Sequence, residues 1–365
     1  MTQISREAVE NAIREYRDPY LNSDLYELDA VKSLEIDGGR VEVSVELNYP
    51  SEGIAGALKQ LVGNAIENVD GVESVNVNTR QKIRSYQAQK ELQSIAGVKN
   101  IIAVASGKGG VGKSTTAVNL ALALSQEGCR VGILDADIYG PSVGMMLGVP
   151  EGKRPDTKDN KFFIPVEAHG IQAMSMAFLV TDKTPMVWRG PMVSGAVQQL
   201  LTQTLWNDLD YLIVDMPPGT GDIQLTLAQK VPVTGAVVVT TPQDIALLDC
   251  KKGIEMFRKV DIPVLGIVEN MSVHICSNCG HHEALFGEGG GHRVAEAYDT
   301  EVLGQLPLHM TIREQTDGGS PTVVAESDSE IARLYRDIAR KLGALLSKRE
   351  RNLASPIPSI SISDD

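Results

Sequence analysis

The sequence predicts an α/β fold in which a small α+β domain precedes a doubly wound, mostly parallel sheet. Two observations lead to this prediction. From residue 98 onward, short apolar runs alternate with helix-like stretches, which is the pattern of a parallel sheet covered by helices. A glycine-rich loop at residues 107–114 lies between the first apolar run and a helix-like run at 115–127. The strands expected in this sheet are residues 101–105, 130–134, 171–176, 211–214, 236–240, 264–268 and 302–306.

The residues before this sheet carry shorter elements and are expected to form a domain of their own. Apolar and polar residues alternate after an Asp37-Gly38-Gly39 turn, which is typical of a hairpin. The elements expected here are a helix at 5–16, the hairpin at 34–47, a helix at 53–69 and a strand at 72–77. The predicted divisions are an α+β domain at 1–85, a polar linker at 86–97, the larger domain at 98–347 and a disordered tail at 348–365.

Composition narrows the class of protein. A chain of 365 residues allows two or three domains and a large buried core. Hydrophobic residues make up 42% and charged residues 22%, which is typical of globular proteins. The net charge of −13 argues against a large nucleic-acid surface. The first residues form no apolar signal-peptide core, and no run of about 18 apolar residues predicts a membrane span. A cytoplasmic protein is therefore expected.

Residues 107–114 read G-x4-G-K-S, the pattern of a phosphate-binding P-loop. Its glycines let the backbone wrap closely around a polyphosphate, while N–H groups at the start of the following helix point at the negative charge. Lys113 is expected to pair with the β- and γ-phosphates, and the Ser114 hydroxyl to ligate Mg²⁺. The residues predicted to bind the nucleotide here are Gly107, Lys108, Gly109, Gly110, Val111, Gly112, Lys113, Ser114 and Thr115.

Acidic residues end two of the expected strands. Asp135 and Asp137 follow one strand and fall on the same side of an extended chain, at the carboxyl end where α/β sites lie. Asp215 ends the apolar run 211–214, the Walker B arrangement, and is expected to hold Mg²⁺ through water. The segment 216–222 after it is rich in glycine and proline, as a nucleotide-sensing switch loop is. Considered by themselves, Asp135 and Asp137 are also consistent with a structural role, in which two acids at a strand end cap the following turn.

The four cysteines divide into one close pair and two single residues. Cys276 and Cys279 form a C-x-x-C turn, which brings two thiolates to one side as zinc and iron–sulfur sites require. Cys129 and Cys250 are expected to be small buried residues. A four-thiolate [4Fe–4S] cluster therefore needs a second chain, and a two-fold dimer supplies it. A zinc knuckle completed by His281 or His282, a redox pair and two free thiols remain alternatives.

Taken together, these segments resemble the Mrp/ApbC-type iron–sulfur cluster carrier ATPases, which are deviant P-loop proteins similar to MinD and ParA. The residues that carry the resemblance are SGKGGVGKST at 106–115, DADIYGPS at 135–142, IVDMPPGTGD at 213–222, TTPQDIALLD at 240–249, and ENMS with CSNCG within 269–280. Residues 1–85 resemble the MIP18-type domain often fused to this family. They contain no cysteine, so a docking role is expected for them rather than cluster binding.

The resemblance implies roles for individual residues. The second lysine of the loop, Lys108, is expected to reach the nucleotide of a partner chain, so Lys108, Lys113 and Asp137 are the predicted catalytic residues. Asp137 would orient the attacking water, Asp135 would contact water on Mg²⁺, and Asn270 would hydrogen-bond adenine.

The resemblance also implies cofactors and partners. The implied cofactors are ATP, Mg²⁺ and a [4Fe–4S] cluster bound at a homodimer interface through Cys276 and Cys279. The implied activity is slow ATP hydrolysis. The implied partners are the assembly scaffold proteins that supply the cluster and the apo iron–sulfur proteins to which it is transferred. No nucleic acid or membrane partner is expected. The alternative function is a ParA/MinD-like positioning ATPase with a structural zinc at the C-x-x-C.

Overall fold

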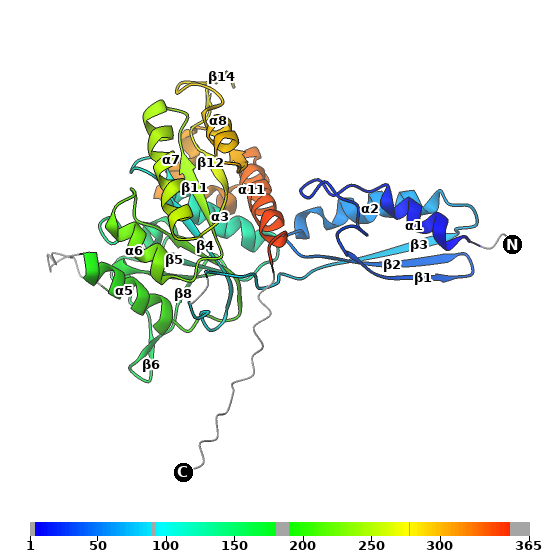
Figure 1. Ribbon diagram of the computed structural model, residues 1–365, viewed down its shortest axis with the longest axis horizontal. Coiled ribbons are helices and arrows are strands. Elements are labelled where there is room, and N and C mark those ends of the chain that lie inside the picture. The colour runs from blue at the N-terminus through cyan, green and yellow to red at the C-terminus, as the bar shows by residue number, and fades with distance from the viewer. Residues whose placement is uncertain (1–3, 90–91, 180–189, 277, 351–365) are drawn as a thin grey trace, which may run out of the picture.

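The computed structural model describes residues 4–89, 92–179, 190–276 and 278–350. Two layered bodies are visible in Figure 1: a small domain built from the N-terminal residues, and a larger one that contains the central sheet. The small domain extends from the side of the larger one on which the last helix lies. The predicted disordered tail at 348–365 lies outside the described residues from residue 351 onward.

The N-terminal domain is the α+β unit that the sequence predicts. Its sheet has the order β1-β2-β3, with β1 and β2 antiparallel and β3 parallel to β2. Both helices pack on one face of this sheet (Figure 1). Alternate residues of β2, such as Val41, Val43 and Val45, point to this face and are buried beneath the helices. Its elements are α1 (Arg6–Arg14), β1 (Val31–Asp37), β2 (Arg40–Leu47), η1 (Glu52–Ile54), α2 (Ala55–Glu67) and β3 (Ser74–Gln81).

The larger domain is built on an eight-stranded sheet with the order β15-β12-β11-β4-β10-β5-β9-β8. Neighbouring strands are parallel except β8, which runs antiparallel to β9 at the edge. All seven strands predicted for this sheet are present. Its strands are β4 (Val98–Ala105), β5 (Val131–Asp135), β8 (Val166–Ala168), β9 (Ile171–Ser175), β10 (Leu209–Asp215), β11 (Gly235–Thr240), β12 (Val264–Glu269) and β15 (Val302–Gln305).

Two short hairpins lie outside this sheet. One consists of β6 (Thr157–Lys158) and β7 (Phe162–Phe163), and the other of β13 (His274–Ile275) and β14 (His282–Glu283). The second hairpin lies at one extreme of the molecule, beyond α8 (Gly290–Ala297; Figure 1). Because it carries the C-x-x-C, the two thiols stand at the periphery of the fold.

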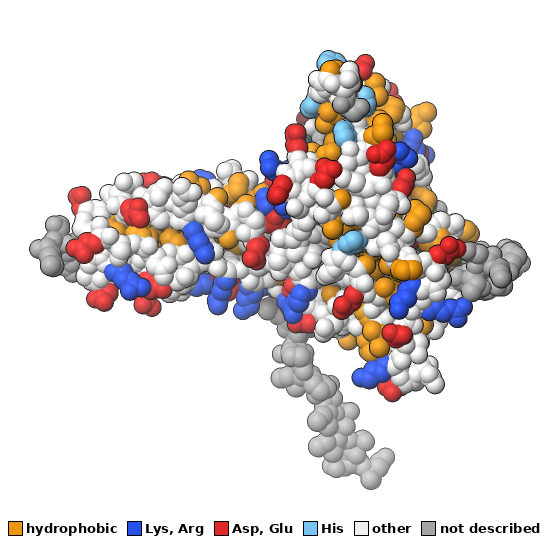
Figure 2. Space-filling model, turned by 180° about the vertical axis from the view of Figure 1, so that it is seen from behind, with side chains coloured by type: hydrophobic (Ala, Val, Ile, Leu, Met, Phe, Trp, Pro, Cys, Tyr) orange, Lys and Arg blue, Asp and Glu red, His pale blue; other side chains and the backbone are white. Residues whose placement is uncertain are grey.

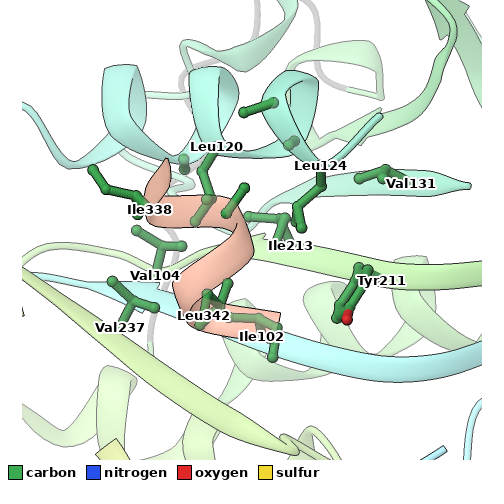
Figure 3. Packing of buried hydrophobic residues seen from close by; sticks show 14 of the residues in the cluster. Ile102, Val104, Leu120, Leu124, Val131, Tyr211, Ile213, Val237, Ile338 and Leu342 are labelled. Carbon is green, nitrogen blue, oxygen red and sulfur yellow. The ribbon is translucent and has the colours of Figure 1, made fainter. Parts of the chain in front are cut away.

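Helices cover both faces of the large sheet and bury two hydrophobic clusters against it. Figure 3 shows one of them, in which Leu120 and Leu124 of the helix after the P-loop and Leu342 of the last helix pack on the central strands. None of the described helices has the length and apolar character that a membrane span needs. The helices are α3 (Lys113–Gln126), α4 (Val143–Met146), η2 (Met176–Phe178), α5 (Gly190–Gln203), α6 (Asp222–Lys230), α7 (Asp244–Lys259), α8 (Gly290–Ala297), α9 (Met310–Asp317), α10 (Thr322–Ala325) and α11 (Glu330–Ser347).

The two domains meet at the far end of the P-loop helix α3. Glu127, the buried residue that ends this helix, accepts a hydrogen bond from Arg340 of α11 at 2.6 Å and from the backbone N–H of Gly53 at 2.9 Å. Tyr86, in the segment between the domains, is buried in the core of the larger one, and its N–H donates to Asn100 at 3.1 Å. The N-terminal domain is therefore held against the larger domain by packed and hydrogen-bonded contacts.

Candidate functional site

The glycine-rich loop lies between β4 and α3, as the sequence predicts. Gly110 and Gly112 have φ angles of 83° and 82°, in the left-handed region that glycine adopts without steric cost. Gly107 lies against helix α7, and a Cβ at this position would be 2.1 Å from the carbonyl oxygen of Asp249. The tip of the loop is exposed at Gly109 and Gly110. This backbone leaves the first N–H groups of α3 facing a site where a phosphate chain can lie.

Lys113 and Asp215 form a buried ion pair beneath the loop. The Lys113 Nζ lies 2.5 Å from Asp215 Oδ1 and 3.0 Å from the Ser114 hydroxyl. The second carboxylate oxygen, Asp215 Oδ2, is buried and has no hydrogen-bond partner among the described residues. Burial raises the pKa of Asp215, and the charge of Lys113 opposes that rise. An oxygen set made of this carboxylate and the Ser114 hydroxyl is the kind that Mg²⁺ or its bound water prefers, so these residues fit the ion.

Asp135 stands directly beside Asp215, because the two residues pair in register at the ends of β5 and β10. Burial, followed by the charge of Asp215, raises the pKa of Asp135 to about 7. Its carboxylate accepts four hydrogen bonds, from the N–H of Asp137 at 3.1 Å, the N–H of Ser142 at 3.0 Å, the N–H of Val143 at 3.1 Å and the hydroxyl of Ser175 at 3.1 Å. The structure thus gives Asp135 a role in fixing the loop after β5, and its contact with Mg²⁺-bound water stays a prediction.

Asp137 faces the same site. It is half-buried, and its negative charge is one of the causes that raise the pKa of Asp215. The two carboxylates are therefore within electrostatic reach of each other, although Asp137 lies in the loop after β5 and Asp215 ends β10. The loop after β10 also contacts the P-loop segment, since the N–H of Gly219 donates to the carbonyl of Ser106 at 2.9 Å.

Asn270 contacts the P-loop itself. Its side-chain Nδ2 donates to the carbonyl of Val111 at 2.9 Å, and a Cβ at Gly112 would lie 2.1 Å from the same nitrogen. Only a glycine therefore lets this amide approach so closely. The expected hydrogen bond of Asn270 to adenine stays a prediction, and the structure shows the amide bonded to the glycine-rich loop.

Cys276 and Cys279 lie at the tip of the β13–β14 hairpin. The N–H of Cys276 donates to the carbonyl of His281 at 2.9 Å, and the N–H of Gly280 donates to the carbonyl of Cys276 at 2.8 Å. Cys279 is exposed and Cys276 is half-buried. Hydrogen bonds from the N–H groups of Cys279 and Asn278, and then from the Cys279 thiol, hold the pKa of Cys276 below its usual value. The turn thus favours the thiolate form that ligates metals.

The other two cysteines are buried residues of the core, as predicted. Cys129 is 5% and Cys250 1% exposed, and burial raises the pKa of both thiols. Across the described part of the chain, no group of three or more His, Cys, Asp or Glu side chains is arranged to hold a metal ion. Among the described residues, Cys276, Cys279 and a neighbouring histidine therefore do not come together as a zinc knuckle.

Glu269 joins the end of β12 to α8 and β15, a role that sequence reasoning missed. It ends β12 and is buried, and its carboxylate accepts the N–H of Gly291 at 2.5 Å and the amide of Gln305 at 2.7 Å. Gly291 lies in α8, the helix that follows the hairpin, whereas the next residue in the chain, Asn270, holds the P-loop. The signal for it in the sequence is an acid at the end of an apolar strand.

Comparison with known families assigns both domains. The family model described as NUBPL iron-transfer P-loop NTPase matches residues 97–343. A second model, described as iron-sulfur cluster assembly protein, matches residues 6–78. Among solved structures, a nucleotide-binding protein in complex with ADP from Archaeoglobus fulgidus is 37% identical, with a TM-score of 0.57, and the match covers 66% of this chain and 93% of that one.

Relatives cover most of the chain. An iron-sulfur cluster carrier protein of Pseudomonas fragi is 68% identical over 275 residues, which are 75% of this chain and 96% of that protein. One of Escherichia coli strain K12 is 52% identical over 341 residues, or 93% of this chain and 92% of that protein. The iron-sulfur cluster transfer protein NUBPL of Mus musculus is 49% identical over 274 residues, which are 74% of this chain and 85% of that protein. The chain therefore belongs to the iron–sulfur cluster carrier family of ParA-like P-loop NTPases, with an N-terminal iron–sulfur assembly domain.

Proposed function

We propose that this protein is an ATP-dependent carrier that holds a [4Fe–4S] cluster between two copies of the chain and transfers it to apo-proteins. The observation that carries the proposal is the pair of thiols at the hairpin tip. Cys276 and Cys279 lie where another protein can reach them, and the pKa of Cys276 is lowered by backbone N–H groups. A thiol pair at the periphery suits a cluster that is cargo, which must be released, rather than one buried for electron transfer.

The dimeric arrangement follows from the number of thiols. A [4Fe–4S] cluster is commonly held by four thiolates, and one chain offers two at the tip while Cys129 and Cys250 are buried elsewhere. Two chains related by a two-fold axis supply four equivalent ligands. The same axis would allow Lys108, at the edge of the exposed P-loop tip, to reach the nucleotide of the partner.

ATP is proposed to bind with its phosphates in the loop 107–114. Lys113 would exchange Asp215 for the β- and γ-phosphates, and this exchange frees a buried carboxylate beside the Mg²⁺ site. Mg²⁺, when bound through Ser114 and water on Asp215, would neutralise charge on the phosphates. Two buried carboxyl groups lie side by side here, and a divalent cation would offset the repulsion between their charged forms.

The proposed partners are a second copy of the chain, assembly scaffold proteins that supply the cluster, and apo iron–sulfur proteins that receive it. All four cysteines are free, which suits a reducing compartment such as the cytoplasm. Slow turnover fits a carrier, because each ATP would be used once per cluster movement rather than in continuous catalysis.

Replacing Asp137 by Asn is expected to slow ATP hydrolysis by about 100-fold while ATP remains bound, because a neutral amide aligns the attacking water without accepting its proton. The measurement is phosphate release together with nucleotide affinity. Asp159→Asn, at an exposed turn between β6 and β7, is the matched control and should hydrolyse ATP normally. A native rate in Asp137→Asn would remove this residue from the catalytic set.

A transfer assay tests the proposed function. Protein reconstituted with iron and sulfide is mixed with an apo-enzyme whose activity requires a [4Fe–4S] cluster, in the presence of a chelator that captures free iron. We expect activity to return with the loaded carrier, and not with the Cys276→Ala variant or with iron and sulfide at the same concentration. Equal recovery from the variant or from the free ions would contradict the carrier function.

A further inference from the structure

A cavity of about 560 Å³ lies beside the cysteine hairpin. One wall is the strand that enters the hairpin, with Val273 and Ile275, together with the loop that leads into α8. The opposite wall is the start of α11, with Ile331 and Leu334, and the segment after β15 contributes Pro307. This cavity, here called the hairpin groove, has the size and the apolar walls of a site that receives a side chain or a small molecule.

The hairpin groove is also acidic. Glu288 and Glu330 are exposed on its two walls, and neither carboxylate has an ion-pair partner among the described residues. Glu269 adds a third carboxylate, which is buried. The described residues that line the groove include no lysine or arginine, and the nearby Arg293 donates to the backbone carbonyl of Glu288 at 2.9 Å. Figure 2 shows histidine side chains at the tip of the molecule and on the surface below it, with acidic side chains around them.

The position of the groove gives access to the two thiols. Ile275, which lines it, is followed in the chain by Cys276, and His282 lines it from the other strand of the hairpin. A side chain held in the groove therefore brings the rest of its chain beside the C-x-x-C. None of residues 107–114 lines the groove, and the N-terminal domain packs at the other end of α11, where Ala344 joins the core of that domain.

We infer that the hairpin groove is the docking site for the protein that receives the cluster, and that this protein presents an apolar side chain flanked by lysine or arginine. The inference rests on the proposed function, because a carrier needs its recipient beside the thiols. The apolar walls suit the apolar side chain, and the carboxylates of Glu288 and Glu330 are complementary to the flanking cations. A contact this small suits a recipient that must leave after each transfer.

The test uses three synthetic apo-peptides that carry the ferredoxin-type C-x2-C-x2-C run as cluster acceptors. Beside this run, the first has a leucine between lysines, the second a leucine between glutamates, and the third a serine between lysines. Each is mixed with the cluster-loaded full chain and an iron chelator, and the cluster on the peptide is followed with time. We expect the first peptide to accept the cluster at least about tenfold faster than either of the others at low ionic strength.

Added salt should reduce the preference over the glutamate peptide, because exposed charges are screened at ionic strengths of about 0.5 M. Equal rates for the three peptides at low ionic strength would overturn the inference. Equal rates for the leucine and serine peptides would overturn the apolar part of it.

Two variants locate the effect in the groove. Glu288→Lys should remove most of the preference for the lysine peptides, whereas Glu296→Lys, the matched control on an exposed residue of α8 outside the groove, should keep it. Both changes alter the net charge equally, so an equal loss in the two variants would overturn the inference. His292→Trp places a large side chain at a residue that lines the groove, and it should slow transfer to the leucine–lysine peptide about tenfold.

Iron content and sedimentation of each variant are measured first, and both should match the native chain because Glu288 and His292 are exposed and are not thiolate ligands. If His292→Trp instead separates two copies of the chain, the groove holds the second copy, and the inference is wrong. A native chain that loads no cluster would contradict the proposed function. Docking is then judged by the binding of dye-labelled peptides to the unloaded chain, with the same tenfold preference expected, so the two claims fail separately.

Discussion

Lys113→Ala is expected to abolish ATP binding at concentrations where the native protein is saturated, a loss of about 100-fold or more. Charge-assisted hydrogen bonds to phosphate are among the strongest polar contacts in a site, and Lys113 is the buried cation beneath the loop. The variant also leaves Asp215 without its cation, so the folded fraction is measured by circular dichroism beside the nucleotide affinity. Burial already raises the pKa of Asp215, so this carboxyl can become neutral and limit the loss of stability.

Lys108→Ala is the matched comparison, because it removes a lysine from the same loop. Lys108 is half-buried next to the exposed Gly109 and Gly110, at the edge of the loop rather than beneath it. We expect this variant to bind ATP with near-native affinity and to lose hydrolysis, since its proposed contact is with the nucleotide of the partner. Equal loss of binding in the two variants would contradict a role across the dimer axis.

Cys276→Ala and Cys279→Ala are each expected to remove the reconstituted cluster. Each substitution deletes two of four ligands in the dimer, since the change occurs in both chains. The broad visible absorption of thiolate-to-iron charge transfer should fall to baseline, and ATP affinity should be unchanged because the thiols belong to a separate hairpin.

Cys129→Ala and Cys250→Ala are the controls, and both should retain the cluster. Their thiols are buried in the core with raised pKa values, so they do not supply thiolates at the tip. Each buried substitution leaves a small cavity, so thermal unfolding is measured to separate lost stability from lost ligands. Loss of the cluster in a folded Cys129 or Cys250 variant would contradict the assignment of the four ligands.

The fold was largely predictable because its strands are buried on both faces. Such strands appear in the sequence as short, continuous apolar runs, and those at 211–214 and 236–240 were found with errors of a residue or two at their ends. The edge strand β8 and the hairpin β6–β7 were missed. They are two or three residues long, and their residues are exposed or only partly buried, so no apolar run indicates them.

The candidate site was predictable in its residue types but not in its contacts. The P-loop and Walker B patterns indicate that Lys113 and Asp215 belong to one site. Their direct ion pair, however, depends on how β4, α3 and β10 pack. The same holds for the bond of Asn270 to Val111 and for Glu269, which contacts Gly291 across 22 positions of sequence. Contacts between strand ends arise from sheet order, which a single sequence does not record.

The iron and sulfide content of the anaerobically reconstituted protein, determined together with its mass in solution, shows directly whether two chains share one cluster. Two thiolates per chain and a cluster shared by two chains predict about four irons and four sulfides per dimer, or about two of each per chain. One tightly bound zinc per monomer without iron uptake, or a complete four-iron cluster on a monomer, would contradict a carrier that holds its cluster between two copies.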